Sequence, residues 1–559
     1  MGDINYQTLE LTQAPPPATH ASHPVVVVGA GPVGLTMALD LAAKGHRVVI
    51  LDDDTTLSKG SRAICFAKRT LDIWDRLGVG SRMMDKGVSW NVGKVFFRNQ
   101  EVWSFNLRPE EGHQRPAFIN LQQYYCEGYL YEAVCAQPLI ELRSGHKVLN
   151  VVNQAEGVHL EVETQQGNYT LEAEWLLACD GSRSAIRRAL GESSSGRVFK
   201  DRFLIADVRM QADFPAERWF WFDPPFHPNQ SVLLHSQPDN VWRIDFQLGW
   251  DADPVEAVKP ENVLPRIRAL LGADAPFELE WVSIYTFACE RMERFRHGRI
   301  LFAGDSAHRV SPFGARGANS GIQDADNLAW KLNLVLNAQA PDCLLDSYSH
   351  ERELAADENI RHSSRSTDFI TPKSEVSRLF RDAALILARR HAFARVLVNS
   401  GRLSLPSAYP DSPLNTADTQ EFSAKATPLG ACVPDAPIEQ NGQQGWWLRQ
   451  LGSGFTLLEF GEGQASQSEA LEELVAQGLL TRLRVWPAGT GAAQAQAQGG
   501  IIDSQDMLRQ RYDAQPGSCY LIRPDQHLCA RWRHLDGQAV QAALHKACGH
   551  FLESASCLH

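Results

Sequence analysis

The sequence predicts a mixed α/β protein of several domains, and three observations lead to this fold class. A continuous apolar run, a glycine turn and a helix near the N-terminus form the pattern of a Rossmann-like βαβ unit. Residues 200–290 are rich in short aromatic strands, and alternating strands and helices after residue 425 indicate a small C-terminal α/β domain. The length of 559 residues also exceeds what one hydrophobic core usually serves.

Composition excludes several classes of partner. The chain is 44% hydrophobic and 21% charged, which is typical of a globular fold, and a net charge of −12 without a basic stripe argues against nucleic acid. No apolar run approaches the roughly 18 residues of a membrane span, so we expect no membrane partner. The 11 cysteines are scattered without CxxC or metal-ligand spacing, so we expect a cytoplasmic protein with free thiols and no metal site. Residues 1–23 lack a secretory pattern and are predicted to form a flexible polar tail.

The first motif lies in residues 25–52, which are predicted as strand, glycine turn, helix and strand. Its turn contains Gly29, Gly31, Pro32 and Gly34. The first glycine allows a tight turn, the second lets the backbone approach a pyrophosphate, and the last lets helix and strand pack closely. The helix N-terminus favours the phosphate charge. Asp52 follows near the spacing expected of an acid that binds ribose hydroxyls, with Asp53 as the alternative, so the motif predicts a dinucleotide site.

Two further segments carry patterns of interest. "LLACDGSRSAIRR", residues 176–188, is predicted as a buried strand that runs into an Asp-Gly turn and a helix. "ILFAGDSAHRVSPFGARGANSGIQDADNLAWKL", residues 300–332, is predicted as strand, loop and a long helix from about Asn319. The remaining segments are helical patterns over residues 60–80 and 122–136, amphipathic helices over 346–400 and a Pro- and Ser-bearing linker over 401–424.

Together, the three segments resemble in order and spacing the three fingerprints of the single-component FAD-dependent aromatic hydroxylases. This family includes para-hydroxybenzoate hydroxylase, phenol hydroxylase and 3-(3-hydroxyphenyl)propionate hydroxylase. The resemblance covers about residues 24–400, and the order of the motifs is more specific than any one of them. It implies a Rossmann-like FAD-binding domain with an inserted antiparallel-sheet substrate domain. The sequence has one Rossmann fingerprint, and the resemblance implies that NADH or NADPH binds transiently as reductant, without a Rossmann fold of its own.

The resemblance implies FAD contacts for residues in the three motifs and between them. They are Gly29, Gly31, Pro32, Gly34, Asp52, Asp53, Arg62, Gln123, Val148, Asp180, Gly304, Asp305, Pro312, Gly317, Ala318 and Asn319. Among these, Arg62 matches an arginine that helps to hold FAD, Gln123 a residue near the flavin, and Val148 a backbone contact to adenine. Asp180, in its Asp-Gly motif, matches a residue linked to both FAD and NAD(P)H.

The loop before the long helix has features that suit a flavin ring. Asp305 matches the family's acid that binds the ribityl chain, and residues 312–319 match the loop over the ring. A helix N-terminus points several N–H groups at one place, where they can stabilise the negative charge of a reduced flavin. Small residues in "PFGARG" allow the backbone to approach the ring closely.

The strand-like segment "VWRIDFQLGW" offers candidate catalytic residues. Because side chains alternate along a strand, Arg243, Asp245 and Gln247 share one face. A similar strand lines the substrate pocket of phenol hydroxylases, so we expect Asp245 or His235 to accept the phenol proton and Arg243 to stabilise the phenolate. A solvated sheet face remains the alternative interpretation of this segment. Tyr285 is a weaker candidate on a neighbouring strand.

The stretch "RWFWFDPPF", residues 218–226, raises an alternative reaction. A flavin-dependent halogenase would carry Trp-x-Trp-x-Ile-Pro, but Asp223 occupies the position of the isoleucine. We therefore interpret the stretch as a strand whose two Trp share one face and whose two Phe share the other, and either face can line an aromatic pocket. A halogenase and a redox-inert FAD-binding protein remain the alternative functions.

Residues 425–559 resemble the thioredoxin-like domain at the C-terminus of the longer phenol hydroxylases, through "PLGACVPDAPI" and "CYLIRPDQHLCARWR". The missing CxxC argues against a redox role for this domain and favours dimerisation or structural support, and we expect a homodimer. The predicted organisation is a tail over 1–23, an FAD-binding domain over 24–195 and 291–345, a substrate domain over 196–290, a helical segment over 346–400, a linker over 401–424 and a thioredoxin-like domain over 425–559.

The resemblance implies hydroxylation of a phenolic substrate with NAD(P)H and O2, through a flavin C4a-hydroperoxide and ortho to an existing hydroxyl. The cofactor performs the oxygen chemistry that side chains cannot. Because the oxygen that it transfers is electrophilic, the ring must be electron-rich, and loss of the phenol proton makes it so. The protein must bind the phenol, help to remove its proton and keep water away.

Overall fold

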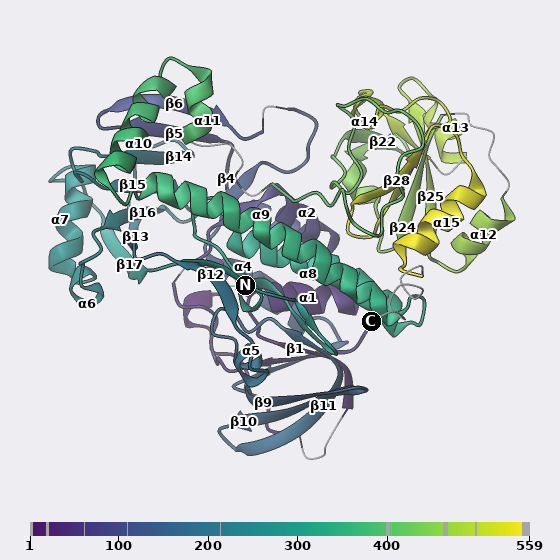
Figure 1. Cartoon of the computed structure of the whole chain (residues 1–559), viewed down its shortest axis with the longest axis horizontal. Helices are drawn as coiled ribbons and strands as arrows, with labels where there is room; N and C mark the ends of the chain where they lie inside the picture. Colours follow the sequence, from purple (N-terminus) through teal and green to yellow (C-terminus); the bar gives the residue numbers. More distant parts are fainter. Residues whose placement is uncertain are drawn as a thin grey trace.

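Three neighbouring bodies lie along the long axis of the molecule, with the antiparallel sheet on the left of Figure 1, the Rossmann-like domain in the centre and the C-terminal domain on the right. A computed structural model describes residues 4–17, 22–60, 62–108, 110–212, 214–398, 403, 405–461, 468–497 and 500–550. No helix in this described part combines the length and the apolarity needed to span a membrane.

The Rossmann-like sheet has the strand order β19-β20-β11-β1-β2-β8, and the β9-β10 hairpin extends β11. Its strands are β1 (Ser22–Val28), β2 (Val48–Asp52), β8 (Ile140–Ser144), β9 (Lys147–Gln154), β10 (Gly157–Thr164), β11 (Gly167–Ala178), β19 (Arg296–His297) and β20 (Ile300–Phe302). The contiguous valines of β1 are buried because parallel strands pair with β1 on both sides and helices cover the sheet. The carboxyl ends of β1, β2, β11 and β20 therefore meet at one edge, where nucleotide sites form in such sheets.

Helices and two small sheets surround this domain. The helices are α1 (Pro32–Ala43), α2 (Lys68–Arg76), α3 (Gly80–Lys86), α4 (Gln123–Cys135), α5 (Ala185–Ala189), α8 (Gly317–Leu336) and α9 (Asp346–Ile370), with 3-10 turns η1 (Tyr6–Thr8), η2 (Gly304–Ser306) and η3 (Asp342–Leu345). The small sheets are β3 (Cys65–Ala67), β7 (Phe118–Asn120) and β4 (Val88–Trp90), and β12 (Ser194–Val198), β18 (Ala288–Met292) and β21 (His308–Arg309).

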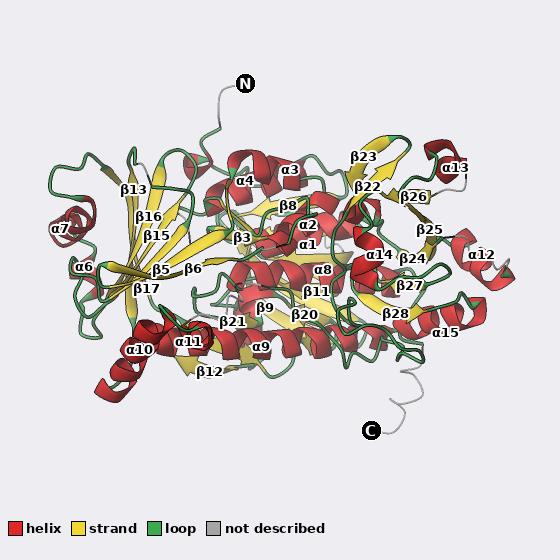
Figure 2. Cartoon of the chain, turned by 90° about the horizontal axis from the view of Figure 1, so that it is seen from above, coloured by secondary structure: helices red, strands yellow, loops and turns green. Residues whose placement is uncertain are grey.

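The antiparallel-sheet domain has the strand order β17-β13-β16-β15-β14-β5-β6. Its strands are β5 (Val92–Phe97), β6 (Gln100–Asn106), β13 (Arg202–Arg209), β14 (Arg218–Phe222), β15 (Ser231–Ser236), β16 (Val241–Leu248) and β17 (Glu278–Tyr285), and its helices are α6 (Pro254–Ala257) and α7 (Pro260–Leu271). Figure 2 shows α6 and α7 on one side of this sheet and the Rossmann-like domain on the other. Strands β5 and β6 come from outside the range predicted for the substrate domain, because β14 pairs with β5.

The two faces of this sheet differ in chemistry. Trp242, Ile244 and Phe246 pack in one core with Trp221 and residues of α7. The opposite face carries Arg243, Asp245 and Gln247, as predicted from the alternation, and Phe222 packs there in a second core. This second core includes residues of α10 (Glu375–Ala388) and α11 (Ala392–Val398). The aromatic stretch therefore places its Trp pair under α7 and its Phe pair toward the Rossmann-like domain.

The C-terminal domain is a mixed sheet with the strand order β23-β22-β26-β25-β24-β27-β28. Its strands are β22 (Pro437–Gln440), β23 (Gln443–Trp446), β24 (Phe455–Phe460), β25 (Leu480–Pro487), β26 (Gly500–Asp503), β27 (Cys519–Ile522) and β28 (Leu528–Trp532). Its helices are α12 (Glu469–Ala476), α13 (Ala492–Ala497), α14 (Met507–Tyr512) and α15 (Gly537–Ala547). A 3-10 turn, η4 (Trp447–Gln450), follows β23. The ring of Trp330, on α8, lies 5.6 Å from that of Phe455 in an edge contact. One hydrophobic core is thus shared between α8 and this domain.

The predicted N-terminal tail and the predicted linker over residues 401–424 both contain residues that are buried in the fold. Tyr6 and Leu11 are buried, and Tyr6 makes edge contacts with Tyr125 and Tyr129 of α4, so the flexible tail predicted for residues 1–23 is wrong for residues 4–17. In the predicted linker, Tyr409 is buried at the interface between the domains. The reason is the same in both cases, since isolated apolar and aromatic residues in a polar stretch find a core elsewhere in the chain. Residues 1–3 and 18–21 of the predicted tail lie outside the described residues.

Candidate active site

The glycine turn at the carboxyl edge of β1 has the geometry of a phosphate cradle. Gly29 has φ 106°, and a Cβ there would lie 2.3 Å from the carbonyl oxygen of Cys179. A Cβ on Gly34 would lie 1.9 Å from the carbonyl oxygen of Gly29, so turn, helix and strand can pack only without these side chains. A Cβ on Gly31 would meet no atom within 4 Å. The space over Gly31, at the N-terminus of α1, is therefore open to a pyrophosphate.

Asp52 ends β2 and braces this turn. Its carboxylate accepts hydrogen bonds from the backbone N–H groups of Ala30 and, at 2.8 Å, Asp54. Burial raises the pKa of Asp52 to about 6, while its neighbour Asp53 is exposed. The N–H of His146 donates to the carbonyl of Asp52 at 2.8 Å, which brings the start of β9 and the predicted adenine contact, Val148, to the same edge.

Two further acids follow neighbouring strands at this edge. Asp180 accepts a hydrogen bond from the N–H of Ile186 at 3.2 Å, but its other carboxylate oxygen is buried without a partner. Asp305 lies in η2, directly after β20, and its side chain is exposed. Desolvation by the surrounding protein nevertheless raises the pKa of Asp305. Burial, with the charge of Asp305 as a further cause, raises the pKa of Tyr285 to about 12, so the antiparallel sheet reaches this acid.

The loop that ends at Gly317 presents the N-terminus of α8 to the same region. Gly314 and Ala315 have φ 119° and 52°, and the left-handed conformation of the alanine is uncommon for a residue with a Cβ. No side chain caps this end of α8, so the N–H groups of its first turn, which include those of Gly317 and Ala318, lack partners within the helix. They form a positive end that suits the carbonyl edge of a flavin.

The Asn319 side chain has a different role from a flavin contact. Its Oδ1 accepts from the N–H of Ala67 at 2.8 Å and from the Thr70 hydroxyl at 2.7 Å. Its Nδ2 donates to the carbonyls of Ala315 at 2.7 Å and Cys65 at 2.8 Å. The amide thus fixes the loop and the start of α8 against β3 and α2, and only the backbone of Asn319 is left for the cofactor.

Gln123 and Arg62 belong to one structural unit. Gln123 accepts from the N–H of Ala63 at 3.0 Å and donates to Glu127 at 2.7 Å, so it positions the chain next to Arg62 rather than pointing into open space. The Arg62 carbonyl accepts from Nη1 of Arg243 at 3.2 Å, and the Arg62 side chain is exposed. Its charge acts on Asp305 and Tyr285, so the structure brings these predicted residues together.

Arg243 is not placed as the phenolate-stabilising cation that we expect from the sequence. Its Nε and Nη2 donate to the two carboxylate oxygens of Asp207 at 2.8 and 2.7 Å, and the side chain is buried. Asp207 is absent from the sequence-based set, although its position in "FLIADVR" is a polar interruption of an apolar strand. Because this bidentate pair neutralises the guanidinium, Arg243 acts as a positioning residue for the Arg62 backbone.

His235 and Asp245 are diagonal neighbours on adjacent strands, since the register pairs His235 with Arg243 and Asp245 with Leu233. The distance from His235 Nε2 to Asp245 Oδ2 is 3.8 Å, and His235 Nδ1 and Asp245 Oδ1 are both buried without a partner. Burial lowers the pKa of His235 well below its usual value and raises the pKa of Asp245 to about 6. A neutral imidazole beside a carboxyl that titrates near pH 6 is suited to accept and relay a proton.

A cavity of about 60 Å³ lies on the Phe face of the antiparallel sheet, beside the loop over residues 312–319, which we call the flavin loop. It is lined by Lys94, Val95, Phe105, Arg218, Phe220, Phe222, Phe313, Gly314, Ser366, Ile370, Val398 and Leu403. Strand register places Arg218 next to His235 in the same row as Arg243, so the cavity borders the acid–base pair. Arg218 is missing from the sequence-based set because nothing near it in the chain distinguishes it from an edge arginine. It is 9% exposed, and burial lowers its pKa; among the described residues it forms no ion pair or hydrogen bond.

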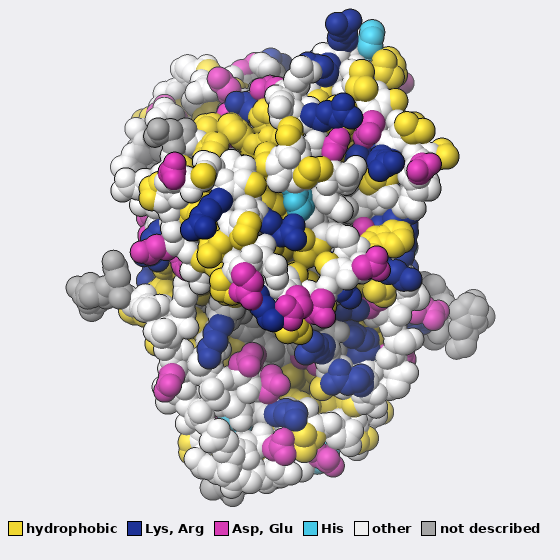
Figure 3. Space-filling model, turned by 90° about the vertical axis from the view of Figure 1, so that its left-hand side faces the viewer, with side chains coloured by type: hydrophobic (Ala, Val, Ile, Leu, Met, Phe, Trp, Pro, Cys, Tyr) yellow, Lys and Arg dark blue, Asp and Glu magenta, His cyan; other side chains and the backbone are white. Residues whose placement is uncertain are grey.

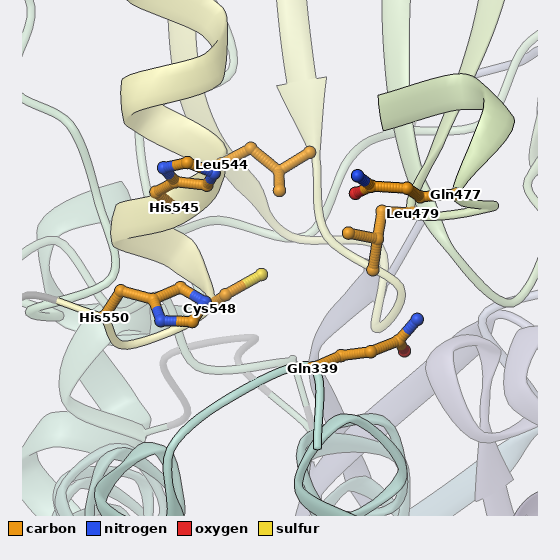
Figure 4. A pocket seen from close by; sticks show the side chains of 7 residues that line it. All are labelled: Gln339, Gln477, Leu479, Leu544, His545, Cys548 and His550. Atoms are coloured by element: carbon orange, nitrogen blue, oxygen red, sulfur yellow. The ribbon is translucent and has the colours of Figure 1, made fainter. Parts of the chain in front are cut away.

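A larger cavity of about 370 Å³ lies elsewhere in the molecule (Figure 4). His545, Cys548 and His550 line one side of it, and Gln339 lies below. Gln339 follows the C-terminal end of α8, a helix of 20 residues and therefore roughly 30 Å long. The flavin loop is at the other end of α8, so this cavity is separate from the site described above.

Comparisons with known proteins agree with this arrangement. The family model described as "FAD binding domain" matches residues 22–363. The chain is 32% identical over 343 residues, or 61% of its length and 64% of the relative's, to a probable NADH-specific resorcinol 4-hydroxylase of Rhodococcus jostii (strain RHA1). It is 26% identical over 90% of its length and 89% of the relative's to a 3-(3-hydroxy-phenyl)propionate/3-hydroxycinnamic acid hydroxylase of Mycolicibacterium smegmatis (strain ATCC 700084 / mc(2)155).

A solved structure with the same fold is the flavin-dependent monooxygenase PieE in complex with FAD and substrate, with a TM-score of 0.78, 23% identity and coverage of 94% of this chain and 98% of that one. The predicted fold class and the predicted cofactor, FAD with a nicotinamide reductant, are confirmed. The open space over Gly31, the unpartnered oxygen of Asp180 and the uncapped end of α8 fit this cofactor. The chain belongs to the FAD binding domain family, and it is a flavin-dependent aromatic hydroxylase.

Proposed function

We propose that the chain hydroxylates a phenolic ring ortho to its hydroxyl, with NAD(P)H and O2 as co-substrates. The observation that carries this proposal is the His235–Asp245 pair beside a Phe-lined cavity at the flavin loop. The named substrates of the two relatives, resorcinol and 3-(3-hydroxyphenyl)propionate, are phenols, which supports the same substrate class. FAD, when bound, supplies the activated oxygen.

The side chains around the cavity divide the remaining tasks. Asp245 accepts the phenol proton, which the His235 imidazole relays. Loss of this proton makes the ring electron-rich at the ortho position. Phe220, Phe222 and Phe313 exclude water from the reacting atoms. The first turn of α8 stabilises negative charge on the cofactor's carbonyl edge. Trp219 and Trp221 contribute to none of these steps, because they pack with the α7 side of the sheet, and the halogenase alternative loses its motif.

Arg218 narrows the substrate class further. The nearby charge of Asp245 offsets part of the cost of burying this cation, and an anionic ligand group that pairs with Arg218 would offset more of it. We therefore propose a phenol with a carboxylate substituent, which binds Arg218 while the hydroxyl reaches Asp245. Of the two named substrates above, 3-(3-hydroxyphenyl)propionate has such a group and resorcinol does not.

The test is turnover by the FAD-loaded protein. NADH and NADPH oxidation is followed with 3-(3-hydroxyphenyl)propionate, resorcinol and, as a control without a phenol, 3-phenylpropionate. We expect the phenols to stimulate oxidation and to yield a catechol-type product that carries one atom from ¹⁸O2. The proposal is overturned if no phenol stimulates oxidation, or if stimulated oxidation gives no oxygenated product.

We also propose that the protein forms a homodimer through α10 and α11. Exposed apolar side chains gather on these two helices: Val376, Leu379, Phe380, Ile386, Leu387, Phe393, Val396 and Leu397 are 42–76% exposed. Figure 3 shows hydrophobic side chains in the upper half of the face on which Figure 1 places these helices. Exposed apolar side chains that gather on one face often mark a protein–protein contact, and the interface of a stable dimer needs roughly 800 Å² from each partner. Light scattering on the wild type and on Phe393→Asp tests this, and a monomeric wild type contradicts it.

A further inference from the structure

The C-terminal domain carries a cluster of reactive side chains that the hydroxylation site does not use. An isolated β-bridge places Cys432 opposite His527. Cys432 Sγ lies 3.2 Å from His527 Nε2. The other ring nitrogen, Nδ1, lies 2.9 Å from the carbonyl oxygen of Asp525 and 3.3 Å from its carboxylate. Asp525 thus fixes the orientation of the imidazole, and the imidazole faces the thiol.

The charges around Cys432 favour its thiolate. Burial opposes the thiolate, but the positive charges of His527 and Arg69 outweigh it and lower the pKa of Cys432. Burial also disfavours the imidazolium, yet Cys432 and Asp525 raise the pKa of His527 to about 10. Both shifts favour the thiolate–imidazolium form of the pair, which is the form of a nucleophilic cysteine.

Arg69 completes the cluster from the other domain. It lies on α2, and its Nη2 donates to the Asp525 carbonyl at 2.7 Å and pairs with Asp326 at 2.5 Å. Its Nε–H is buried and has no acceptor among the described residues. An unsatisfied buried donor close to a thiolate is the group that a small oxygen-bearing ligand would satisfy. Cys432 itself is only partly buried.

We propose that Cys432, with His527 and Arg69, is a site that reduces a small hydroperoxide, with hydrogen peroxide as the simplest case. The Cys432 thiolate attacks one oxygen; an S–O bond forms and the O–O bond breaks. The sulfur loses two electrons and becomes a sulfenic acid. The departing hydroxide takes the proton of the His527 imidazolium and leaves as water, while Arg69 donates a hydrogen bond to the oxygens. This inference stands on the cluster alone and does not need the proposed hydroxylation.

The first test is the pH dependence of alkylation of the full-length FAD-loaded protein by iodoacetamide, quantified for each cysteine peptide by mass spectrometry. Free cysteine loses roughly 80-fold in rate between pH 8 and pH 6, as its pKa of about 8.5 dictates. We expect the rate at Cys432 to fall less steeply than this, because its pKa is lowered. No labelling at Cys432, or a decline like that of free cysteine, overturns the proposal. Because this test uses the wild type, it does not depend on a variant that folds.

The second test is trapping of the sulfenic acid with dimedone after treatment with hydrogen peroxide. We expect the adduct on Cys432 in the wild type, with the exposed Cys135 as the internal reference for reagent access. His527→Gln should lower the yield at Cys432 at least tenfold, whereas His534→Gln, a change at an exposed histidine of the same domain, should not. An adduct that forms faster on Cys135, or one that His527→Gln leaves unchanged, contradicts the assignment.

Discussion

His235 and Asp245 lie 3.8 Å apart on the sheet face that borders the Phe-lined cavity. Burial keeps the imidazole neutral near pH 7 and raises the pKa of Asp245 to about 6. Burial thus moves the two pKa values in opposite directions, that of the imidazole downward and that of the carboxyl upward. Perturbed pKa values of this kind are typical of acid–base sites. The pair therefore has the chemistry to hold a phenol proton, and the base form of Asp245 is present above about pH 6.

Asp245→Asn removes this base. We expect kcat to fall by roughly 10²- to 10⁴-fold, the usual contribution of a positioned base. In the wild type, kcat/KM should rise with pH through about 6, because Asp245 must lose its proton before it can accept one from the phenol. Steady-state kinetics between pH 5 and pH 8 measure both effects. If Asp245→Asn retains the rise in kcat/KM near pH 6, a group other than Asp245 causes that rise.

Arg218→Gln tests the carboxylate partner. We expect the KM for 3-(3-hydroxyphenyl)propionate to rise at least tenfold, because loss of one partner of a buried charge pair usually costs 2 kcal/mol or more, while the kinetics with resorcinol change little. Arg98→Gln is the matched control, since Arg98 lies exposed on the same domain and pairs with Asp223. Equal effects on both substrates would mean that Arg218 has a structural role.

At the scale of elements, the alternation along β16 predicts which residues share a face, and the glycine turn predicts the βαβ unit, because both signals are local in sequence. What the alternation does not determine is which face meets the flavin domain. That depends on strand pairing across the sheet and on the packing of α7, neither of which is local. The same limit explains Asp207, whose partner Arg243 is on a neighbouring strand, and the Asn319 amide, three of whose partners lie about 250 positions away.

The glycine turn allows a matched pair of substitutions. Gly31→Ala should leave the thermal stability of the apoprotein nearly unchanged, because its Cβ meets no protein atom, but should weaken FAD binding by filling the cradle. Gly34→Ala should destabilise the fold by more than about 1–3 kcal/mol, because its Cβ would lie 1.9 Å from a backbone oxygen. Thermal unfolding with and without FAD distinguishes the two. Equal loss of stability in both variants would contradict the assignment of Gly31.

At the scale of the whole molecule, buried charges join the Rossmann-like and C-terminal domains. Glu351, on α9, accepts hydrogen bonds from Arg523 at 2.6 and 2.9 Å and from Lys331 at 2.8 Å. Although burial opposes it, the two cations hold the pKa of Glu351 well below its usual value. Burial lowers the pKa of Lys331 to about 8. A network this deep is stable only when every charge has its partner.

Glu351→Gln leaves Arg523 and Lys331 without their anion, so we expect a loss of about 3–5 kcal/mol in the free energy of unfolding. Since the folded state depresses the pKa of Glu351, its contribution is full above its ordinary pKa near 4.3 and is lost as pH falls below it. Denaturant titrations at pH 7 measure the loss, and Asp357→Asn, at an exposed position of the same helix, is the control. Similar stability of the two variants would show that the network does not hold the domains.

Helix α8 begins at the flavin loop and ends with Trp330 and Leu334 inside the core that it shares with the C-terminal domain. One consequence concerns how such genes can be shortened or recombined. A chain cut before residue 425 would uncover these apolar side chains and free the far end of the helix that presents its N–H groups to the cofactor. The C-terminal domain therefore cannot be exchanged without a redesign of α8. Recombination between related genes has to keep α8 and this domain together.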